Sequence, residues 1–134
     1  MRYVSLAVLI LAAFFVRGYL GSLFTHPCGT HQNPAIPGDF PNDVPVYPNH
    51  HVEEARKIAG AFELELTAKS DAQTVLAFYQ QQLAAYGWQV SETSKEESDD
   101  GNGFGITATK DARAVAVLVT PVKGGESAIR ELVR

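Results

Sequence analysis

The feature that most limits what this chain can fold into is an apolar N-terminal run that passes into a proline-rich segment. Residues 3–16 read YVSLAVLILAAFFV, and apolar character resumes after Arg17 as far as Phe24. A stretch of that length can span a bilayer. Arg17 lies toward one end of the stretch, from where its long side chain can reach the interface. We therefore expect residues 1–24 to form a signal anchor, that is, a transmembrane segment.

Two processed forms are alternatives to an uncleaved anchor. Signal cleavage requires small residues near the cut, and sites after Gly18 or Ser22 satisfy this only in part. Lipidation would fall on Cys28, the only cysteine, but Pro27 stands before it where a small residue is needed. All three readings export the rest of the chain.

The distribution of positive charge predicts the orientation of this segment. Arg2 precedes the apolar run, and apart from Arg17 no Lys or Arg follows before Arg56. The positive-inside rule then keeps the N-terminus in the cytoplasm. The predicted location is the cytoplasmic membrane, with the remaining chain outside the cytoplasm, in the periplasm or at the cell surface.

Residues 25–50 are expected to form an extended tether. Prolines recur at 27, 34, 37, 41, 45 and 48, a spacing that forbids helix and favours a polyproline-like spacer. The later part, residues 40–48, contains Phe, Val and Tyr, so we expect it to lie against the folded domain. His50 and His51 are expected to form a turn into that domain.

The tether also holds the candidate metal ligands, which are weak ones. His26, Cys28 and His31 have ligand-like spacing for zinc or copper. A structural site usually needs four oriented ligands and a second shell of partners, and the tether supplies neither. We therefore predict no metal and no other cofactor, and keep metal or small-ligand binding through this stem as the alternative function.

Residues 51–134 are expected to form one small α+β domain. Alternating apolar residues predict strands at 58–68, 88–90, 104–109, 114–119 and 127–133. Between the first two, Ser70 and Gln73 form a capping box for a helix that ends at Gly87. The polar residues 95–103 are expected to form a hairpin loop. The predicted fold is β-α-β-β-β-β, with one helix on one face of a four- to five-stranded antiparallel sheet.

The composition excludes several functions. The net charge is −4, with Lys and Arg scattered among Asp and Glu, so no basic stripe for nucleic acid is expected. No cysteine or histidine lies beyond His51, which removes Cys-His and Ser-His catalysis from the domain. Glu63 and Glu65 point to the same side of one strand, where they are interpreted as a solubilising surface. We expect no enzyme and predict no catalytic residue.

Three segments together resemble a known group of proteins. They are FPNDVPVYP at 40–48, AFYQQQL at 77–83 leading to Tyr86-Gly87-Trp88, and ITATKD at 106–111. The chain resembles bacterial exported proteins and lipoproteins that pair a DVPVYP opening with an FYxxxLxxxGW helix and a small sheet. It departs from them at Asn49-His50, where Gly-Ala would stand. The resemblance implies an envelope location and an α+β fold, and it implies no activity.

The functional expectation is a membrane-tethered, non-enzymatic interaction module outside the cytoplasm. Its partners would be the membrane, through the N-terminal segment, and an envelope protein or polymer, bound through the outer sheet face or the tether. Nucleic acid is not an expected partner.

Overall fold

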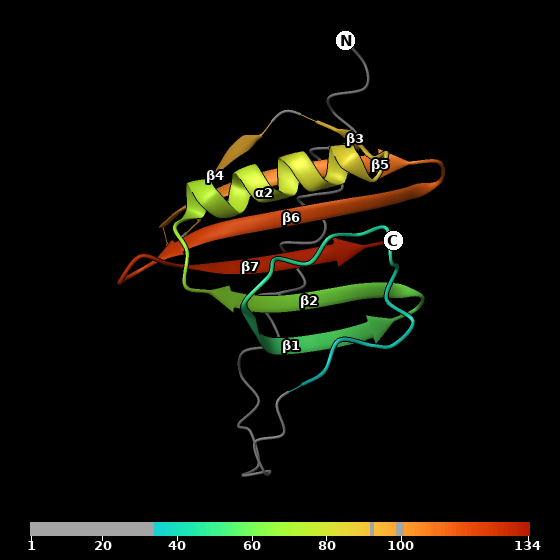
Figure 1. Cartoon of the computed structure of the whole chain (residues 1–134), viewed down its shortest axis with the longest axis horizontal. Helices are drawn as coiled ribbons and strands as arrows, with labels where there is room; N and C mark the ends of the chain where they lie inside the picture. The colour runs from blue at the N-terminus through green and yellow to red at the C-terminus, as the bar shows by residue number, and fades with distance from the viewer. Residues whose placement is uncertain (1–33, 92, 99–100) are drawn as a thin grey trace. The chain divides into compact units, whose positions relative to one another are not determined.

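The computed structural model describes residues 34–91, 93–98 and 101–134. These residues form one helix and one antiparallel sheet with the strand order β1-β2-β7-β6-β5-β3, and β4 also pairs with β5 (Figure 1). The elements are β1 (His50–Ile58), β2 (Ala61–Ala68), α2 (Ala72–Ala85), β3 (Gln89–Val90), β4 (Ser94–Ser98), β5 (Gly101–Lys110), β6 (Arg113–Val122) and β7 (Glu126–Val133). The predicted α+β class, with one helix against an antiparallel sheet, is confirmed.

The predicted strand number is wrong, because the sheet has seven strands and not four or five. The five expected strands correspond to β2, β3, β5, β6 and β7, and the two additional ones are β1 and β4. Strand β4 occupies part of the expected loop at 95–103 and pairs with the start of β5. Its sequence, SKEES, has no apolar residue to mark a buried face, so alternation could not reveal it.

Strand β1 was missed for a different reason. A β-bulge between Val52 and Glu54 leaves Glu53 without a register partner in β2, although its side chain accepts a hydrogen bond from Thr67. The extra residue breaks the period of two on which sequence patterns depend. His50 and His51 therefore begin a strand, and the turn expected there is wrong. The turn into the domain lies just before β1, at Pro48-Asn49, where Asn49 has positive φ. A second turn at Ala59-Gly60, where both residues have positive φ, separates β1 from β2.

Helix α2 begins one residue later than its capping box suggests. Asp71 is the N-cap, and its side chain accepts a hydrogen bond from the Thr74 backbone N–H. At the other end Gly87 has φ +84°, and the Trp88 N–H donates to the Leu83 carbonyl at 2.9 Å. This is a Schellman motif, so the predicted C-terminal glycine cap is confirmed.

The sheet has an inner face covered by two elements. The core side chains of α2 are Ala72, Val75, Leu76, Tyr79 and Leu83. The helix packs against β3, β5, β6 and β7. Residues 34–49, here called the docking segment, run beside the helix in front of β1 and β2 (Figure 1). Its Val44 and Tyr47 are buried in the same core as Leu64 and Leu66 of β2. The expectation that residues 40–48 lie against the domain is confirmed.

The outer face carries the alternate residues of each strand. Thr107, Ala116 and Leu132 lie side by side on β5, β6 and β7, and all are partly buried. Glu63, Glu65 and Arg130 lie on β2 and β7 of the same face. The described part of the chain contains no helix with the length and hydropathy of a membrane span. The expected anchor, residues 1–24, lies outside the described residues.

Candidate functional site

The weak metal candidates, His26, Cys28 and His31, lie outside the described residues. Among the residues that are described, no group of three or more His, Cys, Asp or Glu side chains could hold a metal ion. His50 contacts the docking segment: its Nδ1 lies at hydrogen-bond distance, 2.5 Å, from the Tyr47 carbonyl oxygen. His51 is exposed.

Glu63 and Glu65 do point to the same face of β2, as the alternation predicts. Arg130 of β7 lies between them, with Nη2 2.5 Å from Glu65 Oε1 and Nε 4.0 Å from Glu63 Oε1. The three side chains are between 28% and 43% exposed. The geometry fits a charged surface patch rather than a pair of catalytic carboxylates.

Asp43 holds the middle of the docking segment. Its carboxylate accepts hydrogen bonds from Arg113 at 2.9 and 2.5 Å and from Lys110 at 3.0 Å. The two cations hold the pKa of Asp43 well below its usual value, and hydrogen bonding by Arg113 is the largest cause. The Asp43 carbonyl oxygen also accepts a hydrogen bond from Trp88 Nε1 at 2.6 Å. Asp43 thus binds the segment to the C-terminal end of α2 and to the β5–β6 turn.

Tyr47 holds the docking segment near its C-terminal end. Its hydroxyl donates to Ser70 Oγ at 2.9 Å, just before α2. Its ring makes an edge contact with Phe78, with centroids 5.0 Å apart. Its backbone N–H donates to the Tyr79 hydroxyl at 3.2 Å. The segment and the helix therefore share a buried hydrogen bond.

The Tyr79 hydroxyl is hydrogen-bonded to the one fully buried carboxyl group among the described residues. It donates a hydrogen bond to Oε1 of Glu131, which lies on the inner face of β7 and has no solvent exposure. The second oxygen, Oε2, has no hydrogen-bond partner among the described residues. Desolvation raises the pKa of Glu131 to about 8, against the opposing effect of the Tyr79 hydrogen bond. Desolvation also raises the pKa of Tyr79, with the charge of Glu131 adding to it.

This buried chain of groups joins three parts of the fold. Glu131 belongs to β7, Tyr79 to α2 and the Tyr47 amide to the docking segment. Because a buried carboxylate is costly, the pair favours the protonated form near neutral pH. In that form Oε2 becomes a donor, and a buried donor without an acceptor costs about 1–3 kcal/mol. The site is suited to holding a proton inside the domain.

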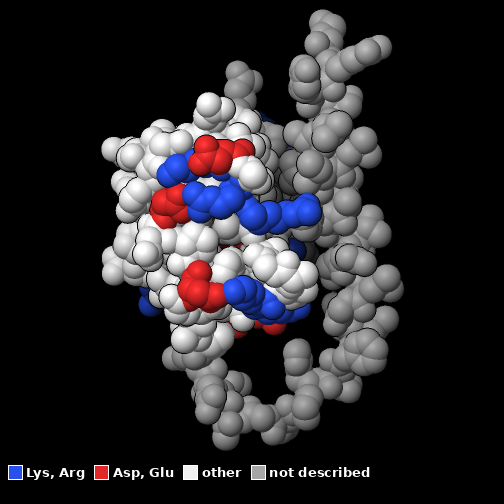
Figure 2. All heavy atoms as spheres, turned by 90° about the vertical axis from the view of Figure 1, so that its right-hand side faces the viewer, with Lys and Arg blue, Asp and Glu red and all other residues white. Residues whose placement is uncertain are grey.

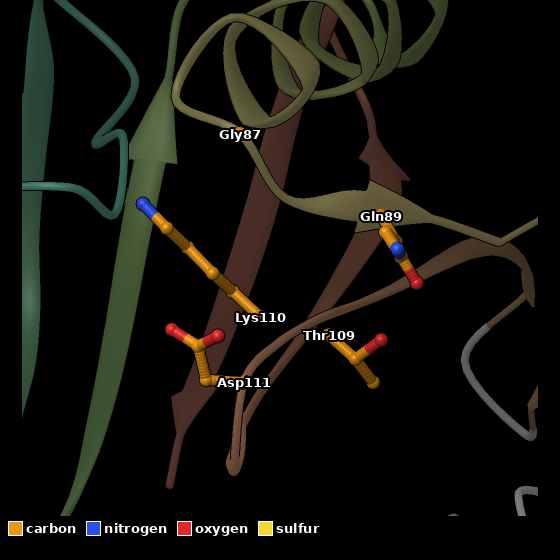
Figure 3. A pocket seen from close by; sticks show the side chains of 5 residues that line it. All are labelled: Gly87, Gln89, Thr109, Lys110 and Asp111. Atoms are coloured by element: carbon orange, nitrogen blue, oxygen red, sulfur yellow. The ribbon is translucent and has the colours of Figure 1, made fainter.

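A surface hollow of about 340 Å³ lies close to the Asp43 contacts and is lined by Gly87, Gln89, Thr109, Lys110 and Asp111. Figure 3 shows the Lys110 side chain running from the β5–β6 turn toward the end of α2. Its ammonium group already donates to Asp43 and, at 2.7 Å, to the Tyr86 carbonyl. The hollow therefore offers no unpaired cation of its own.

Sequence reasoning missed both Glu131 and Asp43. Glu131 carried a usable signal, because it falls in the inward register Ser127, Ile129, Glu131, Val133 of an alternating strand. A carboxyl group at an inward position is a departure from the pattern that indicates burial. Asp43 carried no such signal, since its cationic partners lie about 70 residues away in sequence.

The fold and the site define a small α+β domain in which one helix and an extended segment close the inner face of an antiparallel sheet. A family model described as START domain-like matches residues 53–128, more than half of the chain. The chain belongs to this START domain-like family. The match does not reach residues 40–48, so the resemblance based on the DVPVYP motif stays a prediction. Searches of curated proteins and of solved structures gave no match.

Proposed function

We propose that this chain is a non-enzymatic interaction module that binds an envelope protein or polymer through the outer face of its sheet. In this proposal residues 1–24 hold it in the cytoplasmic membrane, with the N-terminus inside and the α+β domain outside. The observation that carries the proposal is that α2 and the docking segment both lie on the inner face. Part of the expected tether is buried in the core and is therefore not free to bind a partner. The outer face of the sheet remains for this role.

The chemistry of the outer face supports a protein partner. One half carries the charged residues Glu63, Glu65 and Arg130, and the other half carries the small or uncharged residues Thr107, Ala116 and Leu132. Mixed charge beside small neutral side chains suits a polar protein surface. Lys and Arg also lie next to Asp and Glu at the end of the sheet seen in Figure 2. That end shows no single-signed stripe of the kind that nucleic acid requires.

The absence of enzymatic activity is part of the proposal. In the described part of the chain, the only histidines are His50 and His51. The carboxyl group with the raised pKa, Glu131, is fully buried, and its hydrogen-bond partner among the described residues is Tyr79 rather than a histidine or cysteine.

The test is recovery of partners from chemically crosslinked cells. We expect a reproducible partner with the native chain and loss of it with Ala116→Arg, which places a long cation in the middle of the outer face. Gln81→Arg, on the exposed side of α2, is the matched control and retains the partner. Failure of the native chain to recover any reproducible partner, or equal recovery with both variants, contradicts the proposal.

A second candidate function is binding of a small ligand that accepts a hydrogen bond from the protonated carboxyl group of Glu131. The buried Oε2 atom, which lacks a partner among the described residues, favours it. Native mass spectrometry of the purified chain tests this idea. A bound small molecule that is lost on Glu131→Leu and retained on Glu65→Gln supports it, whereas identical ligand-free masses for all three proteins exclude it.

A further inference from the structure

Strand β1 is an edge strand, and its sequence is complementary to itself. In the described residues β1 pairs with β2 alone, so one side of it carries no ladder partner. Residues 52–58 read VEEARKI. Reversed about Ala55, Glu54 of one copy meets Arg56 of the other on both sides of the centre. From this symmetry we propose that β1 pairs antiparallel with β1 of a second copy of this chain, joining two sheets into one.

The side-chain faces agree with this register at its three central pairs, whereas the bulge places Val52 on the inner face and Ile58 on the outer one. Glu54 and Arg56 lie on the outer face, opposite Glu65 and Glu63 of β2. Arg56 already forms an ion pair with Glu54 along its own strand. In the proposed dimer, Glu54 of each copy lies opposite Arg56 of the other. Four charges of alternating sign then form a closed square, and the ion pair within each strand is kept.

The same register relieves an unfavourable contact within one copy. Glu54 lies directly opposite Glu65 across the β1–β2 ladder, and like charges in that position are destabilising. Arg56 of a second copy would flank Glu54 on its other side. Ala55, at the centre of the pairing, has a small side chain that permits close approach of the two strands.

The exposure of β1 leaves room for a partner. The side chains of Arg56 and Lys57 are 49% and 46% exposed, and Ile58 is a large hydrophobic residue at 57%. Charges that protect an edge usually repel any incoming strand, and a run of lysine is the common device. Here the sign reverses about Ala55, so the charges repel many strands but attract an antiparallel copy. The bulge at Glu53 lies outside the three central pairs. This inference does not depend on the outer-face function proposed above.

Crosslinking of the full chain in its membrane tests the proposal. In a Cys28→Ser background, Ala55→Cys places two thiols directly opposite each other, at a Cα separation of about 5 Å that permits a disulfide. Ile58→Cys is the control, because its two copies would lie about 20 Å apart. With copper phenanthroline and oxygen as oxidant, we expect at least about tenfold more dimer from Ala55→Cys.

Charge variants in the Ala55→Cys background test the register itself. Glu54→Arg and Arg56→Glu should each lower dimer formation about tenfold, because both central ion pairs become repulsive. A mixture of the two variants restores the crosslink, and so does the double variant Glu54→Arg/Arg56→Glu, which keeps the complementarity within one chain.

Equal crosslinking of Ala55→Cys and Ile58→Cys, or no crosslinking of either, overturns the proposal. Indifference of the dimer to the single charge changes also overturns it. If a single charge variant does not fold, the test rests on the double variant Glu54→Arg/Arg56→Glu. Loss of the dimer in that variant contradicts the proposed pairing.

Discussion

Glu131 is the residue whose environment has the largest consequence for stability. Its folded pKa of about 8 lies above the ordinary value of 4.5, because burial disfavours the charged form. The native protein therefore binds a proton that the unfolded chain releases between these values. The free energy of unfolding should be highest at the acid end of this window and fall as pH rises to about 8, by on the order of 4 kcal/mol.

The variant Glu131→Gln tests this pH dependence. Glutamine does not ionise and can still accept the hydrogen bond from Tyr79, so the decline between pH 4.5 and 8 should disappear. Urea unfolding at several pH values measures it. Glu65→Gln on the outer face keeps the buried carboxyl group and keeps the decline. The interpretation is wrong if native chain and Glu131→Gln show the same slope.

Asp43 is the second residue whose substitution should change the stability of the domain measurably. Asp43→Ala removes a carboxylate, 29% exposed, from its two cationic partners Lys110 and Arg113, and we expect the free energy of unfolding to fall by about 1–2 kcal/mol. The depressed pKa of Asp43 means that its contribution is present above about pH 3.8 and is lost as pH falls below that value.

Asp39→Ala is the matched control for Asp43, because both residues lie in the docking segment. The Asp39 side chain is 59% exposed in its ion pair with Lys57, so its loss should lower stability much less than the loss of Asp43 does. Chemical denaturation measures both variants. Equal losses would contradict the role given to Asp43.

At the scale of elements, the end of α2 depends on Gly87. Its φ of +84° is unfavourable for residues with a side chain, so Gly87→Ala should lower stability by about 1–2 kcal/mol. A Cβ atom there would meet only Lys110 side-chain atoms at 3.8 Å, which excludes a clash as the cause. Gly38→Ala, where a Cβ meets nothing within 4 Å, should change little. Thermal unfolding distinguishes the two, and an unchanged melting temperature for Gly87→Ala would refute the cap.

The elements that sequence could predict are those with an unbroken pattern. Strands β2, β5, β6 and β7 bury every second residue, and α2 has a clear glycine stop. Strand β1 was hidden because Glu53 interrupts its alternation, and β4 because its residues are polar on both sides. The helical pattern also fails at Tyr86. This residue fits the spacing of the buried apolar residues, but it lies beyond the last turn of α2 and is 46% exposed. The site was less predictable, because the partners of Asp43 and Glu131 come together only in the folded chain.

At the scale of the whole molecule, the stability of the domain depends on the docking segment. The proline pattern predicts only a spacer for these residues. Val44 and Tyr47 are buried, and they meet the helix and the sheet in one core. A chain that begins at residue 34 should unfold cooperatively, whereas a chain that begins at residue 50 should lose its cooperative transition. Circular dichroism during heating measures this. Equal transitions for the two chains would show that the segment is dispensable.

The central claim is that the outer face of the sheet, and not the helical side, meets a partner. Site-specific photo-crosslinking in living cells tests it most directly, with a photoreactive amino acid at Thr107 on the outer face or at Ala77 on the exposed side of α2. The account predicts a discrete adduct of higher mass from position 107 and none from position 77. Adducts from position 77 alone, or from neither position, would contradict it.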